Sequence, residues 1–230
     1  MKTLKHILAL TTGALCYIAL ALAITTYDNA NMHPVINESI TDAFMKNFVN
    51  TVAPPEALKR YLFVLDGSRT YSGPAVTNSG YFASGTTESD VAKTPKGWIS
   101  HGGYSADIPE VPAALRHFYD PLGIDDGKTW LTDRGTYWEW MVNNNAFNPR
   151  INARDWALTH ADNPWSFAKG KEWMRKALTE EDERMRNGYM ARAWRCLGET
   201  LHLIADMGCP VHVRNDSHAD VAGWQYRRAL

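Results

Sequence analysis

The chain has 230 residues, and its 24 Lys and Arg against 25 Asp and Glu give a formal net charge of −1 at pH 7. This balance argues against a broad basic surface that binds nucleic acid or anionic lipid. Hydrophobic residues make up 45% of the sequence and charged residues 21%, which argues against a disordered or collagen-like chain. The length predicts one large domain or two small ones.

The N-terminal segment, residues 1–24, is typical of a secretory signal. Lys2 and Lys5 precede an apolar run over residues 7–24, and alternating alanines near its end offer cleavage sites. The run is also close to the ~17–25 residues that span a bilayer, so an uncleaved anchor is the alternative. We therefore expect a secreted, periplasmic or cell-surface protein in which residues 25–230 form one domain.

The first part of this domain is predicted to be helical, and a long irregular region follows it. A second, short helix is predicted over 55–65, where Pro55 stands at the first helical position. From 66 to 121, glycine, serine, threonine and proline recur without a helical period, which predicts a long loop with a short hairpin near 80–84. The first helix is predicted from four apolar residues that recur at every fourth position. They are Ile36, Ile40, Phe44 and Phe48.

Helix is predicted again after Asn152, and the longest helix lies near the end of the sequence. Asn163 is expected to cap one helix, and Thr179 is expected to cap a second that runs over 180–207 without proline. An apolar stripe on this long helix is expected to be its buried face. It consists of Met190, Ala193, Trp194, Leu197, Leu201 and Ile204. A different face carries Arg195, Glu199, His202 and Asp206.

The sharpest motif is the segment 202–212, HLIADMGCPVH. His202 and Asp206 are one helical turn apart, so their side chains project from the same face and can close on one metal ion. Gly208 and Pro210 predict a turn that returns His212 toward the helix end. Glu199, one turn before His202, is available to hold that ring's second nitrogen. The alternative is an ordinary hydrogen-bonded His and Asp on a helix face.

A second group of possible ligands lies in the irregular region. It consists of His101, Asp107, Glu110, His117 and Asp120. The alternative there is a solvated acidic loop. His33, just before the first predicted helix, is a third possible ligand, and its alternative is an incidental polar residue.

Together these segments resemble the zinc-dependent phospholipase C/P1 nuclease superfamily. The resemblance covers essentially the whole chain after residue 24, in order: His33 before a helix, a Gly-Gly pair leading to HFYDP at 117–121, a W-A-L and W-S-F helix pair, and the H-x3-D-x5-H motif. The stretch VHVRND at the end of that motif looks more like the phospholipase C branch. The resemblance implies a mainly α, multi-helix bundle with a long loop-rich insertion, secretion, and three zinc ions in a cleft that hydrolyses phosphodiester bonds.

Six residues match the family's metal ligands in order along the chain. His33 resembles the ligand of the first segment, and His117 resembles the ligand that opens HFYDP. His202 and Asp206 resemble the helix pair, with the aspartate bridging two ions, and His212 resembles the first ligand of the remaining zinc. Asp107 resembles a loop aspartate that binds metal and is a candidate catalytic base; it is preferred to Glu110 because Gly102 and Gly103 precede it.

The sequence also departs from the family pattern at both ends. Members usually begin with a Trp that binds zinc, and no Trp lies between residue 24 and His33. They complete the last zinc site with a second His and an acidic residue, but only His218 follows His212, and no Glu follows Glu199. We therefore expect a domain that is incomplete at its C-terminus, with one or more of the three zinc sites lacking its usual ligands.

The expected function is a secreted, zinc-dependent phosphodiester hydrolase of the phospholipase C type, in which metal-activated water attacks phosphorus. Its expected partner is a phospholipid head group or another phosphodiester, with transient contact to a membrane surface, no stable nucleic-acid complex, and a monomeric chain. The nearest competing function is a single-strand nuclease of the S1/P1 type. Two hypotheses of a different kind are a catalytically inactive secreted binding domain and a helix bundle without metal.

Overall fold

The computed structural model describes residues 32–49, 69–80, 82–109, 113–132 and 150–213. The predicted signal or anchor, the predicted helix over 55–65, Glu110 and His218 all lie outside these residues. Within them, no helix combines the length and the apolar character that crossing a membrane requires.

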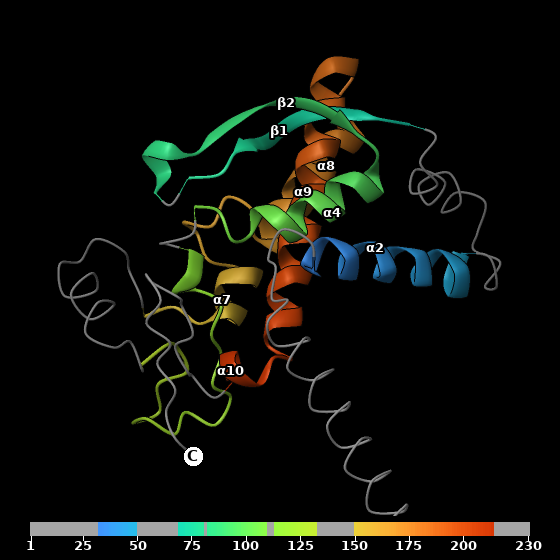
Figure 1. The fold of residues 1–230 in the computed structure, drawn as a ribbon. Helices are drawn as coiled ribbons and strands as arrows, with labels where there is room; N and C mark the ends of the chain where they lie inside the picture. Colours follow the sequence, from blue (N-terminus) through green and yellow to red (C-terminus); the bar gives the residue numbers. More distant parts are fainter. Residues whose placement is uncertain (1–31, 50–68, 81, 110–112, 133–149, 214–230) are drawn as a thin grey trace, which may run out of the picture.

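The described part of the chain is mainly α, as the sequence predicts, with one small sheet (Figure 1). Its helices are α2 (Met32–Phe44), followed by a π-helical segment (Met45–Val49), α4 (Pro95–Ser105), α7 (Ala153–Leu158), α8 (Phe167–Thr179), α9 (Glu183–Asp206) and α10 (Pro210–Val213). The strands β1 (Tyr71–Asn78) and β2 (Thr87–Lys93) form an antiparallel hairpin, and Ala83–Gly85 between them is a 3₁₀ turn.

Helix α9 is the centre of the arrangement. It packs against α4 and α8, and it also contacts β1 and α7. Figure 1 shows the hairpin lying across one end of α9, with α7 and α10 at the opposite end and α2 running across it. The α2 helix packs against α4 and touches α9, so residues from both ends of the described chain meet beside α9.

The expectation of a long loop over 66–121 is wrong, because that stretch contains the hairpin and α4. The hairpin is longer than the one predicted near 80–84, and it packs through a cluster of Tyr71, Ala75, Trp98 and Ala191. Helix α4 begins at Pro95, and the Thr94 hydroxyl caps it by accepting the Gly97 amide hydrogen at 3.0 Å. Because β1 buries small residues and α4 contains several glycines, neither element has a clear period of apolar residues in the sequence.

Two predicted helix starts are also wrong, although the helices themselves are present. Asp182, not Thr179, caps α9 by accepting the Met185 amide hydrogen at 2.8 Å. Ser166, not Asn163, caps α8. Asn163 instead accepts the Trp165 amide hydrogen and donates to the Trp156 carbonyl, which closes the turn before α8. The predicted return of helix after Asn152 is confirmed by α7, which Asn152 caps.

The predicted apolar stripe of α9 is only partly buried: Ala193 is buried, and Met190 and Trp194 pack against the core cluster of the hairpin. Ile204 of the apolar stripe is 49% exposed, whereas the polar face with Arg195, Glu199, His202 and Asp206 is buried. The charge of Arg195 is compensated there, because its Nε donates to Glu199 at 2.9 Å and its Nη1 to Glu88 at 2.6 Å. A buried charge is tolerated when it is paired and hydrogen-bonded in this way.

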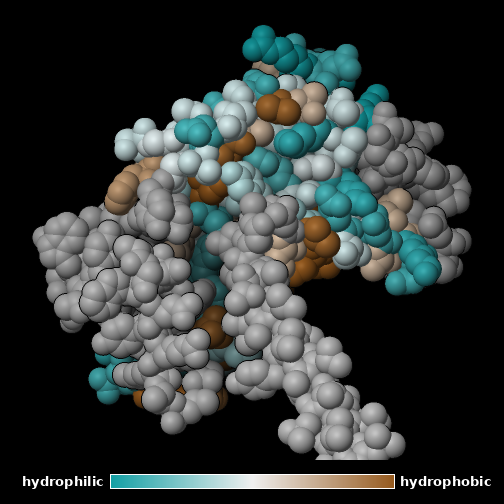
Figure 2. Space-filling model, in the orientation of Figure 1, coloured by the Kyte–Doolittle hydropathy of each residue, from teal (hydrophilic) through white to brown (hydrophobic). Residues whose placement is uncertain are grey.

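The predicted apolar stripe of α2 is also not its most buried face; Ile36 is half-buried, and the Phe48 side chain lies outside what the structure describes. Ile40 and Phe44 are 42% and 40% exposed, whereas His33, Asn37 and Thr41 are buried at the same four-residue spacing. Figure 2 shows a mainly hydrophilic described surface, with an apolar patch over α2. The helix therefore turns its polar side toward α4 and α9, and His33 lies in its first turn rather than before it.

Helices α4 and α9 cross at two glycines. A Cβ atom added at Gly102 would lie 2.5 Å from the Arg195 carbonyl oxygen, and one added at Gly198 would lie against the carbonyl oxygen of Ile99. Any side chain at these positions would push the two backbones apart. This close crossing brings the end of α4 next to the second half of α9, where the candidate site forms.

Candidate metal centre

All six residues predicted as metal ligands lie in one cluster inside the protein. They come from four separate parts of the chain: His33 from α2, Asp107 from the turn after α4, His117 from the following segment, and His202, Asp206 and His212 from α9 and α10. The predicted turn after α9 is present, although Pro210 starts the short helix α10 instead of ending helical structure.

Asp206 is the centre of this cluster. Its Oδ1 lies 3.2 Å from Nε2 of His33, and its Oδ2 lies 3.0 Å from Nδ1 of His117 and 3.1 Å from Nε2 of His202. His212 is more distant, with its Nε2 at 3.9 Å from Oδ1. One buried carboxylate thus faces four imidazole rings.

Asp107 provides the second carboxylate. Its Oδ1 lies 3.3 Å from Nδ1 of His117 and 3.5 Å from Nε2 of His202. The Asp107 side chain is 15% exposed, whereas the Asp206 side chain is fully buried. Asp107 therefore lies on the side of the cluster that water can reach.

Backbone carbonyl groups fix the orientation of two rings. Nδ1 of His202 lies 2.7 Å from the Gly103 carbonyl oxygen, and Nδ1 of His212 lies 2.9 Å from the carbonyl oxygen of His117. A carbonyl accepts only, so Nδ1 is the donor in each ring and Nε2 faces the carboxylates. Glu199 does not orient His202 as expected, because its Oε1 accepts from Ser105 and Arg195 instead. Sequence patterns carry no signal for these backbone acceptors, since a carbonyl group belongs to every residue.

The ionisation of the cluster follows from these contacts. Burial alone would raise the pKa of Asp206, but hydrogen bonds from His117, His202 and His33 hold that pKa well below its usual range. Burial alone would lower the pKa of His202, but the charge of Asp107, the hydrogen bond to Asp206 and the charge of Asp206 raise it to about 9. The cluster therefore strongly favours a carboxylate at 206 and a positive charge beside it.

The donor set fits a metal ion. One ligand atom from each of His33, His202 and Asp206 lies within 4.8 Å of the others, and the same holds for Asp107, His117 and His202. Imidazole nitrogen and carboxylate oxygen are ligands that zinc takes in proteins. Nε2 of His202 is buried without a hydrogen bond of regular geometry, although carboxylate oxygens surround it. A metal ion in place of the imidazole proton would satisfy these converging groups, so they can hold a metal ion.

Two residues of the second predicted group lie outside the cluster. Asp120 uses its carboxylate to accept the amide hydrogens of Leu122, Gly123 and Ile124, and so closes a tight loop. His101 lies on α4, where its Nε2 accepts the amide hydrogen of Val76 at 3.1 Å. Both side chains therefore have structural roles.

His101 makes the stability of the fold depend on pH. Burial, followed by the charges of Arg195 and Lys93, lowers its pKa to about 3. As pH falls through 6.5, His101 becomes protonated in the unfolded chain but stays neutral in the folded chain until about pH 3. The contribution of neutral His101 to stability is therefore fully present above pH 6.5 and is lost as pH falls toward 3. We expect a loss of about 2 kcal/mol between pH 7.5 and pH 5 from this residue.

Denaturant unfolding of the wild type and of His101→Gln at several pH values measures this contribution. The Gln side chain keeps an acceptor for Val76 but does not titrate. The difference in unfolding free energy between the two proteins is expected to change by about 2 kcal/mol over that range, to the disadvantage of the wild type at low pH. Parallel pH profiles would show that His101 is protonated equally in the folded and unfolded states.

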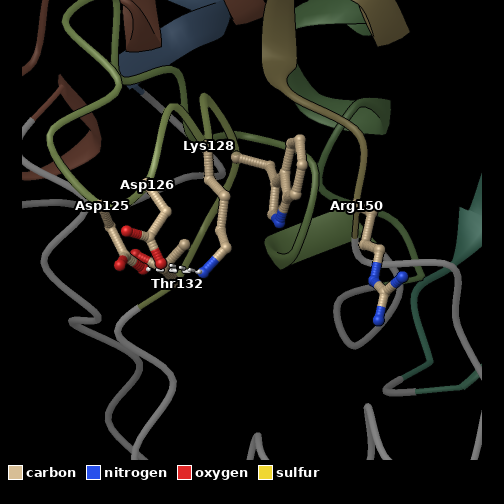
Figure 3. A pocket seen from close by; sticks show the side chains of 6 residues that line it. Asp125, Asp126, Lys128, Thr132 and Arg150 are labelled. Atoms are coloured by element: carbon tan, nitrogen blue, oxygen red, sulfur yellow. Dashed lines mark ion pairs between the residues drawn. The ribbon is translucent and has the colours of Figure 1, made fainter.

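A separate hollow of about 600 Å³ lies beyond the Asp120 loop. It is lined by Asp125, Asp126, Lys128, Trp130, Thr132 and Arg150 (Figure 3). Figure 3 shows Lys128 beside the two aspartates, to which its Nζ is paired at 3.5 and 3.8 Å, while Arg150 stands apart. None of the six predicted ligands lines this hollow.

Comparison of the chain with known protein families, curated proteins and solved structures finds no match.

Proposed function

We propose that this chain is a secreted, zinc-dependent phosphodiester hydrolase of the phospholipase C type. The proposal rests on one observation: the buried Asp206 carboxylate lies within 3.2 Å of imidazole nitrogens from three separate segments. The resemblance of the same residues to the family's ligands, in chain order, connects this geometry with phosphodiester chemistry.

The composition of the cluster favours a bound cation over a purely structural network. Taking ionised side chains out of water costs several kcal/mol for each ion, and the attraction between imperfectly placed partners does not offset that desolvation cost. A structural pair needs one His and one Asp, whereas this cluster holds four rings and two carboxylates. Several buried imidazole nitrogens that face the same carboxylates are typical of metal sites.

When bound, a zinc ion would supply Lewis-acid polarisation of a phosphoryl oxygen and activation of water at neutral pH. His33, His202 and Asp206 would hold it, and Asp107 and His117 offer a second, adjacent set of ligands that shares His202. The Gly103 carbonyl keeps His202 in the tautomer that a ligand needs.

Asp107 is the residue we assign to the reacting water. It is the more exposed of the two carboxylates, and its Oδ2 is buried without a hydrogen bond while Oδ1 faces His117 and His202. Oδ1 is therefore held by the two rings, and Oδ2 would be the oxygen that orients a water molecule inside the cluster or accepts its proton.

The proposal is tested with the purified full chain by elemental analysis and by turnover of two phosphodiesters. We expect at least one zinc per chain and hydrolysis of a chromogenic choline phosphodiester, lost on chelation and restored by Zn²⁺. Preferential cleavage of single-stranded DNA would identify the nuclease function on the same site. Bound zinc with no turnover of either compound would identify a binding domain, and absence of zinc after growth with the metal would overturn the proposal.

A further inference from the structure

Asn37 joins three helices at one point. It lies one turn after His33 on the buried face of α2 and is fully buried. Its Nδ2 donates to the Ile99 carbonyl on α4 at 2.9 Å and to the Gly198 carbonyl on α9 at 3.0 Å. Both neighbours only accept, so the amide nitrogen must face them and the orientation of the side chain is fixed.

These contacts lie at the crossing of α4 and α9. Gly198 is one of the two glycines that let the helices touch. A Cβ atom added at Gly198 would lie against the carbonyl oxygen of Ile99. A Cβ atom at Gly103 would come within 2.8 Å of both Nδ2 of Asn37 and the backbone of His33. The α2 backbone therefore lies directly on α4, and the Asn37 amide is a buried polar link between them.

Two more side-chain contacts join α2 to α4, but they lie nearer the surface. Ser100 donates to Glu38 at 2.8 Å, and Lys96 pairs with Asp42 at 2.7 Å. Both reach α4 alone, whereas the Asn37 amide reaches α4 and α9 together. Asn37 therefore sets the position of α2 relative to both helices.

The same crossing holds His202. Its Nδ1 donates to the Gly103 carbonyl at 2.7 Å, and its ring stacks on the His33 ring with a centroid distance of 3.6 Å. A movement of α2 relative to α4 would therefore separate the two rings and change the position of His33 beside Asp206.

We infer that Asn37 is a positioning residue of the candidate metal centre, because its amide ties the helix of His33 to both helices that carry or orient His202. This inference rests on the proposed metal site for its effect on zinc, and on the helix contacts alone for its effect on α2. Loss of the Asn37 amide is thus expected to loosen α2 before the rest of the fold.

The test compares Asn37→Ala with Asn163→Ala in the full chain. Asn163 is also buried and donates its amide to a backbone carbonyl, that of Trp156, at 2.8 Å. Its two side-chain hydrogen bonds stay within the segment 156–165 and join none of α2, α4 and α9. The first readout is competitive Zn²⁺ binding, where outer-shell substitutions typically weaken metal affinity by ~10–100-fold. We expect a loss in this range for Asn37→Ala and less than about threefold for Asn163→Ala.

The second readout is amide hydrogen exchange of the metal-free chain, and it does not depend on zinc. We expect faster exchange confined to α2 in Asn37→Ala, and in the α7–α8 turn in Asn163→Ala. Unchanged exchange in α2 would overturn the inference whether or not zinc binds. If the wild type binds zinc and Asn37→Ala binds it equally well, the inference about Asn37 is overturned while the proposed function stands. If Asn37→Ala does not fold, Asn37→Ser is measured in its place, since its shorter side chain cannot bridge both carbonyls.

Discussion

Asp206→Asn is expected to remove the zinc and the phosphodiesterase activity that we propose for this chain together. The substitution keeps the shape of the side chain but removes its negative charge, which three imidazole nitrogens surround within 3.2 Å. It also turns one carboxylate oxygen into a donor that faces rings or a cation. We expect Zn²⁺ affinity to fall by more than the ~100-fold upper range of outer-shell substitutions, because a direct ligand is lost.

Asp182→Asn is the matched control for this prediction. It makes the same chemical change at the cap of the same helix, α9, where Asn serves as well as Asp. This variant is expected to keep wild-type zinc content and activity. Zinc content is measured by elemental analysis and activity with the choline phosphodiester. If Asp206→Asn protein keeps the wild-type zinc content, Asp206 is not a metal ligand.

The second large effect is expected at the crossing of α4 and α9. Gly198→Ala places a methyl group against the Ile99 carbonyl oxygen, which belongs to a helix backbone and cannot move aside. Overpacking costs ~1–3 kcal/mol where side chains can adjust. We therefore expect Gly198→Ala to lower the unfolding free energy by about 3 kcal/mol or more, or to prevent folding.

Gly188→Ala on the same helix is expected to have the opposite sign. A Cβ atom there meets only Nη1 of Arg192 at 3.5 Å and the Ser72 carbonyl oxygen at 3.9 Å, both ordinary contacts. Alanine favours a helix over glycine by ~1 kcal/mol, so this variant is expected to gain up to about 1 kcal/mol of stability. Urea unfolding of the two variants measures both effects. Equal stability of the two would mean that α4 and α9 do not touch at Gly198.

The sequence predicts where the helices of the second half lie, but not which faces they bury. In α9 the apolar stripe with Ile204 is partly exposed, and the face with Arg195 and Asp206 is inside. Hydrophobic periodicity assumes that apolar residues are buried, and that assumption fails where a polar cluster occupies the interior. The same failure occurs in α2, where His33 and Asn37 replace Ile40 as the buried face.

The candidate site is easier to predict from the sequence than the fold around it. His202 and Asp206 are one turn apart in the sequence, and the returning His212 follows from the turn after them. His33, Asp107 and His117 come from the family resemblance, and the structure brings them to the same place. The Gly103 carbonyl and the Asn37 amide escape prediction, because backbone acceptors and a lone asparagine carry no sequence pattern.

The distance along the chain between His33 and Asp206 has a consequence for biosynthesis. The two residues touch in the folded protein, yet almost the whole described chain separates them. A ribosome must therefore complete α9 before the first histidine can meet its aspartate. Ligands so far apart in sequence form no preformed chelate in a growing or unfolded chain, so metal loading would be a late step that reports on completed folding.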